Sequence, residues 1–132
     1  MGLISDIFTW WNGPTLSTRL YTKKYGKRIG DDAQGNAYYE DTRGMGPAGK
    51  RRRWVIYNGY AEASKVPPEW YGWLHYMTDM PPEDEAYHAR SWQKPHSENL
   101  TGTSGAYHPS GSLLGETRRP KTDGDYQPWD AE

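Results

Sequence analysis

The sequence predicts an α+β fold: a small three-stranded antiparallel sheet with an N-terminal amphipathic helix, one short Pro-started helix and a long extended C-terminal arm. Apolar residues recur at helical spacing in residues 2–12 and 70–77. Three strand-like segments lie between residues 25 and 57, and only three aliphatic residues follow residue 77. We therefore expect an amphipathic helix in 1–14, an α+β core in 15–82 and a partner-wrapping arm in 83–132.

The composition allows only a small core. Of the 132 residues, 34% are hydrophobic, whereas about 45–50% is usual when Gly is counted as well. A chain that can bury so little apolar surface needs contacts from outside, so we expect a subunit of a larger assembly. The absence of cysteine excludes disulfides and Cys-ligated zinc or iron–sulfur sites.

Charge is distributed unevenly along the chain. Residues 1–65 carry eleven Lys/Arg and six Asp/Glu, whereas residues 66–132 carry five and eleven. This asymmetry is explained either by ordinary solvation of the surface or by a basic head and an acidic tail that face different partners.

The first predicted helix is amphipathic and ends at Gly13-Pro14. It is too short to be stable alone, so it must lie on its own domain, on a lipid headgroup layer or on a partner. Trp10 and Trp11 are predicted partner-binding residues at its end. No apolar run approaches the ~20 residues of a membrane span, which predicts a soluble or peripheral protein.

The sheet is predicted from three segments, 25–30, 36–41 and 52–57. Asp32 to Gly35 has the pattern of a type I turn between the first two. Trp54 and Ile56 alternate with Val55 and Tyr57, so neither face of the third strand is polar and both must be covered or docked. The period of two places Arg51 and Arg53 on one side of this strand, where we expect them to contact an acidic partner surface.

The second predicted helix begins at Pro67-Pro68 and ends before Pro81-Pro82. Its apolar residues follow the i, i+3, i+4, i+7 pattern of a core-facing stripe. We expect the structural core to contain Trp54, Ile56, Trp70, Trp73 and Leu74.

The C-terminal arm combines a polar composition with regularly spaced bulky residues. A purely solvated tail would not need them, so we interpret the segment as disordered alone and ordered along a partner. The predicted partner-binding residues in the arm are Trp92, Leu100, Tyr107 and Trp129.

No catalytic, cofactor-binding or metal-binding site is predicted. Residues 44–50 match two nucleotide-binding patterns, but Arg51 stands where a P-loop needs Ser or Thr, and a strand follows where a helix should start. The four histidines lack metal-ligand spacing. The basic run 50–54 would suit nucleic acid, but the acidic tail and the near-neutral net charge oppose that interpretation.

Several motifs carry a resemblance to a known family. They are residues 35–41, 52–57, 66–70, 73–79 and 99–103, followed by Tyr107. In this order they resemble the small accessory subunit of respiratory complex I known as NADH dehydrogenase alpha-subcomplex subunit twelve. The resemblance covers about residues 25–110; residues 1–24 and 111–132 depart from it.

The resemblance implies a non-catalytic, cofactor-free subunit that assembles or stabilises the peripheral arm of complex I near its junction with the membrane arm. Its implied partners are other hydrophilic subunits, without nucleic acid or a small-molecule substrate, and the N-terminal helix could meet the membrane surface. The implied location is peripheral, on the cytoplasmic or matrix side of the bacterial or mitochondrial inner membrane. Two alternatives stay open: an assembly factor bound only to intermediates, and a nucleic-acid-binding module.

Overall fold

The computed structural model describes residues 13–46, 49–83, 87–114, 118–122, 124–126 and 129, with only the backbone of Met45. The chain forms two compact units, residues 1–99 and residues 100–132, and each is described by itself. Residues 1–12 of the predicted N-terminal helix, with Trp10 and Trp11, lie outside the described residues.

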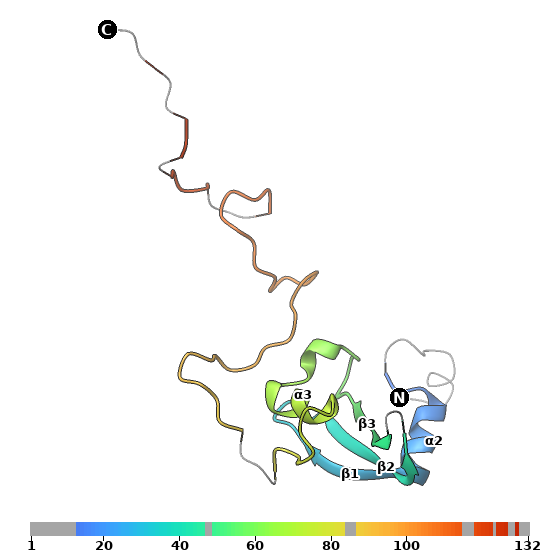
Figure 1. The fold of residues 1–132 in the computed structure, drawn as a ribbon. Helices are drawn as coiled ribbons and strands as arrows, with labels where there is room; N and C mark the ends of the chain where they lie inside the picture. The colour runs from blue at the N-terminus through green and yellow to red at the C-terminus, as the bar shows by residue number, and fades with distance from the viewer. Residues whose placement is uncertain are drawn as a thin grey trace. The chain divides into compact units, whose positions relative to one another are not determined.

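The first unit is an antiparallel sheet with two helices packed beside it (Figure 1). The strands lie in the order β1-β2-β3, which confirms the predicted α+β class and three-stranded sheet. A helix precedes the sheet, and a short 3₁₀ turn and a second helix follow it. The elements are α2 (Leu16–Tyr25), β1 (Gly26–Asp31), β2 (Ala37–Met45), β3 (Arg51–Ile56), η2 (Ala63–Lys65) and α3 (Pro68–Leu74).

Helix α2 was not predicted, although the sequence carries a start signal for it. The Thr15 hydroxyl accepts a hydrogen bond from the Thr18 backbone N–H at 3.3 Å, as an N-cap residue does. The helix then passes directly into β1 at Gly26. A Cβ on Gly26 would lie 2.6 Å from the Thr22 carbonyl oxygen and 3.0 Å from the Trp54 ring, so this junction requires glycine.

The turn between β1 and β2 is built around the Asp32 carboxylate. This group accepts hydrogen bonds from the backbone N–H of Gln34 and of Asn36, each at 2.9 Å, and from the Tyr38 hydroxyl at 2.9 Å. Gly35 takes a positive φ of 82°, and its N–H donates to the Asp32 carbonyl at 3.0 Å. The turn therefore lies where the sequence predicts it and joins the hairpin to the core tyrosine.

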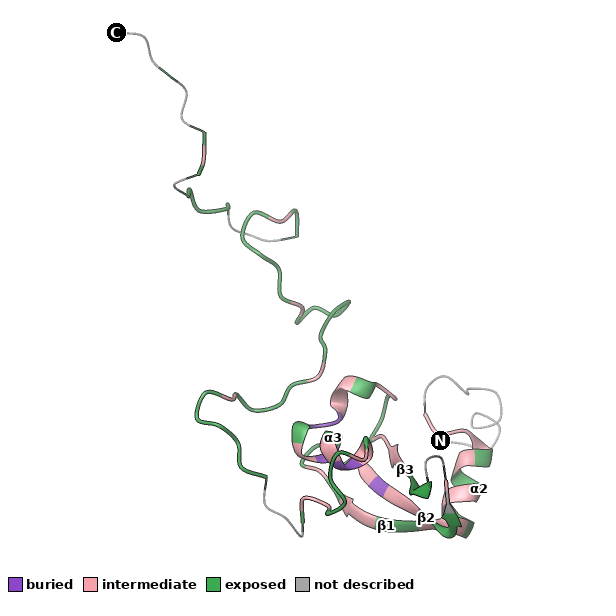
Figure 2. Cartoon of the chain, viewed as in Figure 1, coloured by how far each residue is buried: buried purple, intermediate pink, exposed green. Residues whose placement is uncertain are grey.

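The hydrophobic core lies between the sheet and α3, where the buried positions gather (Figure 2). Tyr38 is fully buried, and Trp70 and Trp73 are each 2% exposed. The Tyr38 and Trp70 rings stack with centroids 4.0 Å apart, and Trp73 meets Trp70 edge-on at 5.6 Å. Leu74 packs against this cluster and is partly buried. Three large rings thus form most of a core that contains few aliphatic residues.

Trp54 and Ile56 do not join that core, because the alternation of the strand turns them to the opposite face, toward α2. There the Trp54 ring stacks on Tyr39 at 6.1 Å and meets Tyr21 edge-on at 5.7 Å. Its indole N–H donates to the Thr22 hydroxyl at 3.0 Å. The predicted single core is therefore divided into two layers, and Trp54 holds the layer beneath α2.

Candidate docking surface

Arg53, one of the predicted docking residues, is 7% exposed and serves the interior of the first unit. Its guanidinium donates to the carbonyl oxygen of Trp73, in the last turn of α3, at 2.7 Å and to that of Thr78, beyond the helix, at 3.0 Å. It also lies 3.4 Å from the Glu40 carboxylate. The carbonyls at a helix C-terminus lack intrahelical donors and attract cations. Its burial argues against the partner contact that we predicted for Arg53.

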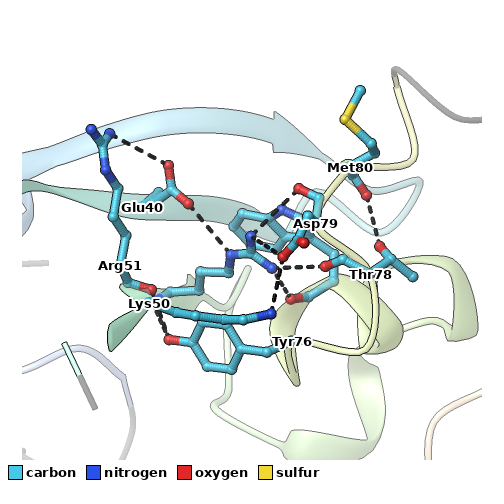
Figure 3. A network of polar contacts seen from close by, with 9 residues as sticks. Glu40, Lys50, Arg51, Tyr76, Thr78, Asp79 and Met80 are labelled. Atoms are coloured by element: carbon cyan, nitrogen blue, oxygen red, sulfur yellow. Dashed lines mark hydrogen bonds and ion pairs between the residues drawn. The ribbon is translucent and has the colours of Figure 1, made fainter. Parts of the chain in front are cut away.

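Arg51 has a different environment on the same strand. Its side chain is 54% exposed and lies 3.8 Å from the Glu40 carboxylate (Figure 3). A weak exposed ion pair of this kind contributes little to stability. Arg51 is therefore available to a partner, whereas Arg53 is committed to α3.

Tyr76 closes part of the free edge of the sheet. Its hydroxyl donates to the Arg51 carbonyl at 2.9 Å and accepts from the Arg53 backbone N–H at 3.1 Å (Figure 3). Tyr76 has a φ of 60°, in the left-handed region that non-glycine residues rarely adopt. The phenol thus occupies two backbone groups that a further strand would otherwise pair with. The edge near Arg51 is consequently unsuited to strand addition by a partner.

A second polar cluster joins α2 to β2. The Tyr21 hydroxyl donates to the Asp41 carboxylate, and the Arg43 guanidinium lies 3.8 Å from the Tyr25 ring centroid. The hydrogen bond from Tyr21, and then the one from the Arg43 backbone N–H, hold the pKa of the Asp41 carboxyl below its usual range. This cluster, like that of Arg53, holds secondary-structure elements together.

The beginning of the predicted arm is attached to the first unit. His96 Nε2 lies 2.8 Å from the Ser64 carbonyl oxygen, and the Asn99 backbone N–H donates to the Ser64 hydroxyl at 2.9 Å. The Glu98 carboxylate lies 3.7 Å from the Lys65 ammonium. We call residues 96–99 the arm root. Since the first unit ends at Asn99, the free arm starts later than the predicted boundary at residue 83.

The remaining arm residues expose their bulky side chains. Within the described parts of 100–132, the structure contains turns and bends but no helix or strand. Tyr107 is 87% exposed and Trp129 is 84% exposed, and Leu100 is exposed as well. Trp92, in the first unit, is 77% exposed. All four arm residues predicted to bind a partner thus present apolar surface to solvent.

The matched region of a known family includes both this sheet and this arm. A family model described as NADH ubiquinone oxidoreductase subunit NDUFA12 matches residues 26–131. The chain belongs to this family. The match begins at the first residue of β1 and includes every later element, whereas α2 precedes it. The resemblance found in the sequence motifs is therefore confirmed. The match also includes residues 111–131, which we expected to depart from the family.

Three relatives named NADH dehydrogenase (ubiquinone) 1 alpha subcomplex subunit 12 are similar to this chain. The one from Dictyostelium discoideum is 35% identical over 104 residues, covering 76% of this chain and 73% of that protein. Those from Bos taurus and Mus musculus are 42% and 40% identical over 97 residues. This match covers 65% of this chain and 64% of each mammalian protein, so the chain spans just under two thirds of their length.

Two other features are absent from the residues that the structure describes. No group of three or more His, Cys, Asp or Glu side chains in this part of the chain is placed to hold a metal ion. None of the helices that the structure describes is long and apolar enough to cross a membrane.

Sequence reasoning missed the arm root and the Tyr76 edge contact, because both depend on residues more than twenty positions apart.

Proposed function

We propose that this chain is a non-catalytic accessory subunit of NADH:ubiquinone oxidoreductase (complex I) that holds hydrophilic subunits of the peripheral arm together near its junction with the membrane arm. The observation that carries the proposal is the exposure of apolar side chains in the described part of residues 100–132. In a member of a complex I subunit family, this segment exposes bulky apolar side chains at intervals. Such side chains are expected to be covered in the functional state.

The length of the segment supports a bridging role. An extended chain rises at most about 3.3–3.6 Å per residue, so the 33 residues from Leu100 to Glu132 can reach on the order of 100 Å. That distance exceeds the diameter of a small domain, which is about 30 Å. One arm can therefore contact more than one neighbouring subunit.

The energetics indicate that the arm does not bind alone. Six large apolar side chains are exposed in the described part of residues 100–132, and burying each contributes about 1.5–3 kcal/mol. Ordering the backbone costs about 1–2 kcal/mol per residue, which exceeds that gain over the whole segment. The first unit must therefore supply a second docking surface. We propose that Arg51 on β3 contributes to it.

The non-catalytic part of the proposal is supported by how the charged groups are used. Arg53, Glu40 and Asp41 are each engaged in contacts between secondary-structure elements.

We further infer a peripheral location on the cytoplasmic or matrix side of the inner membrane, with residues 1–14 able to contact its surface. Release of the protein from washed membranes by alkaline carbonate, without detergent, tests that location.

Native electrophoresis tests the function. A tagged copy of the chain is expressed in its own cells, membranes are solubilised gently, and the gel is stained for NADH dehydrogenase activity. Co-migration with the complete, NADH-oxidising band is the expected result. Migration with smaller species alone would identify an assembly factor instead, and migration with neither would overturn the assignment to complex I.

A further inference from the structure

The described residues cover the face of the sheet beneath α2 incompletely. None of the ten residues of α2, all of them described, is buried. On the sheet below, Tyr39, Trp54 and Ile56 are only partly buried. The opposite face differs, because α3 buries Trp70 and Trp73 against it almost completely. The α2 layer therefore leaves apolar surface for another molecule to cover.

A groove of about 530 Å³ opens between α2 and this face. Tyr39 and Ile56 form part of its apolar lining, and Arg19 and Lys23 line it from the helix. None of the ten described residues that line the groove is acidic. We call this feature the α2 groove. It combines an apolar floor with a positively charged wall.

Among the residues that the structure describes, the charge around the α2 groove has one dominant sign. Helix α2 contains Arg19, Lys23 and Lys24 and no acidic residue. Arg52 is exposed and lines a second groove of about 390 Å³ at the same helix. The Asp41 carboxylate is engaged by Tyr21 and Arg43. A binding partner for this face should therefore carry negative charge together with an apolar group.

We propose that the α2 groove binds a segment of a partner polypeptide in which an acidic side chain lies next to an apolar one. The apolar side chain packs on Tyr39 and Ile56, and the carboxylate meets the Lys23 ammonium. A polypeptide fits better than a nucleic acid, because single-stranded nucleic acids need basic groups along a backbone track and successive stacking platforms. Here the basic groups line the groove from one helix, and its floor includes an aliphatic residue. The inference rests on the proposed function, since it adds to Arg51 a further docking surface on the first unit beside the arm.

Carbodiimide cross-linking of the purified complex I that contains the tagged full chain tests the proposal. This reagent joins an amine to a carboxylate in direct contact, with loss of water. Mass spectrometry should find Lys23 joined to an Asp or Glu of another subunit, beside an apolar residue. The Lys23→Arg variant keeps the charge but cannot couple, so the same link must disappear. A link from Lys23 to Asp6 of this chain, or no link to another subunit, would overturn the proposal.

A matched pair of charge reversals provides the second measurement. Lys23 lines the groove, whereas the adjacent Lys24 does not and lies 5.0 Å from the Tyr25 ring centroid. Lys23→Glu should reduce the fraction of chain retained on complex I after a moderate salt wash about five- to tenfold, and Lys24→Glu should leave it within about twofold. Equal retention of the two variants would overturn the proposal.

The outcomes also separate this inference from the proposed function. If Lys23→Glu is retained like the unmodified chain but removal of residues 100–132 abolishes retention, the accessory-subunit function stands and the groove proposal falls. If the unmodified chain does not co-migrate with complex I, the proposed function itself fails. Anionic vesicles of phosphatidylglycerol and phosphatidylcholine serve as a control. Loss of vesicle binding in Lys23→Glu, with unchanged retention on complex I, would assign the groove to lipid instead.

Discussion

Two arginines that lie two positions apart on β3 have opposite environments. Arg53 is 7% exposed and donates to two carbonyl oxygens at the end of α3, whereas Arg51 is 54% exposed. Two arginines on the same side of one strand therefore have different roles: Arg53 makes an internal contact, and Arg51 is a surface charge. The difference comes from where α3 ends, which the strand sequence does not encode.

Replacement of these arginines by methionine should separate the two roles. Arg53→Met removes the guanidinium donor from the carbonyls of Trp73 and Thr78, and the Trp73 carbonyl keeps the Tyr76 backbone N–H at 3.1 Å. We expect a loss of about 2–4 kcal/mol in the free energy of unfolding. Arg51→Met should change it by less than about 0.5 kcal/mol. Urea denaturation followed by tryptophan fluorescence measures both. Similar values for the two variants would contradict the assigned roles.

The buried hydroxyl of Tyr38 should make the stability of the fold sensitive to alkaline pH. Burial, and then its hydrogen bond to Asp32, raise the pKa of the Tyr38 hydroxyl far above its usual value of about 10. Above pH 10 the unfolded chain ionises this phenol while the folded chain does not, so its contribution to stability is lost as pH rises. The urea concentration at the midpoint of unfolding should therefore decrease as the pH is raised from 9 to 11. The decrease should be smaller in Tyr38→Phe. A parallel pH profile for that variant would exclude Tyr38 as a source of the loss.

At the scale of elements, β3 is covered differently on its two faces. On one face α3 packs large rings closely, and on the other α2 leaves partly exposed aromatics and a groove. The close passage of α2 into β1 depends on Gly26, whose missing side chain lets Trp54 approach the helix. This junction positions α2 above the groove that we propose as a docking site.

Alanine at two glycines should have opposite effects on stability. Gly26→Ala introduces a Cβ 2.6 Å from the Thr22 carbonyl oxygen and 3.0 Å from the Trp54 ring, and we expect a loss of about 1–3 kcal/mol. Gly72→Ala lies inside α3, where the nearest atom would be 3.6 Å away, so a gain of up to about 1 kcal/mol is expected. Thermal unfolding monitored by circular dichroism measures both changes. A stable Gly26→Ala variant would show that the junction can relax.

At the scale of the whole molecule, the chain divides into a folded unit and an arm that exposes apolar side chains. The arm root on Ser64 and Lys65 places the division after Asn99. Residues 87, 89 and 93–96 belong to the folded side, since they help to line a cavity of about 620 Å³ with residues 67–69. The two parts therefore have different tasks, folding and attachment, in the proposed function.

Truncation at two positions should separate these tasks. A chain ending at Asn99 keeps the arm root and should unfold within about 3 °C of the full chain, because the described part of residues 100–132 buries little apolar surface. It should nevertheless be poorly retained by complex I on native gels. A chain ending at Pro82 also loses the contacts at Ser64, and its unfolding temperature should fall further. Full retention of the Asn99 truncation would contradict the role proposed for the arm.

The sequence by itself determined the α+β class, the three strands, the hairpin turn and the aromatic stripe of α3. These features depend on local periodicity and turn chemistry, and Trp70 and Trp73 illustrate this because their spacing alone places both on one helix face. The family also followed from sequence motifs, which the match over residues 26–131 confirms. Only the tertiary structure decided that Trp54 lies apart from that core, that Arg53 is internal and that the free arm begins after Asn99. Trp54 lies beneath α2, a helix that the sequence analysis did not predict. The positions of Arg53 and of the arm boundary depend on atoms at least twenty residues away, the Trp73 carbonyl oxygen and the Ser64 hydroxyl, and local sequence patterns do not specify such contacts.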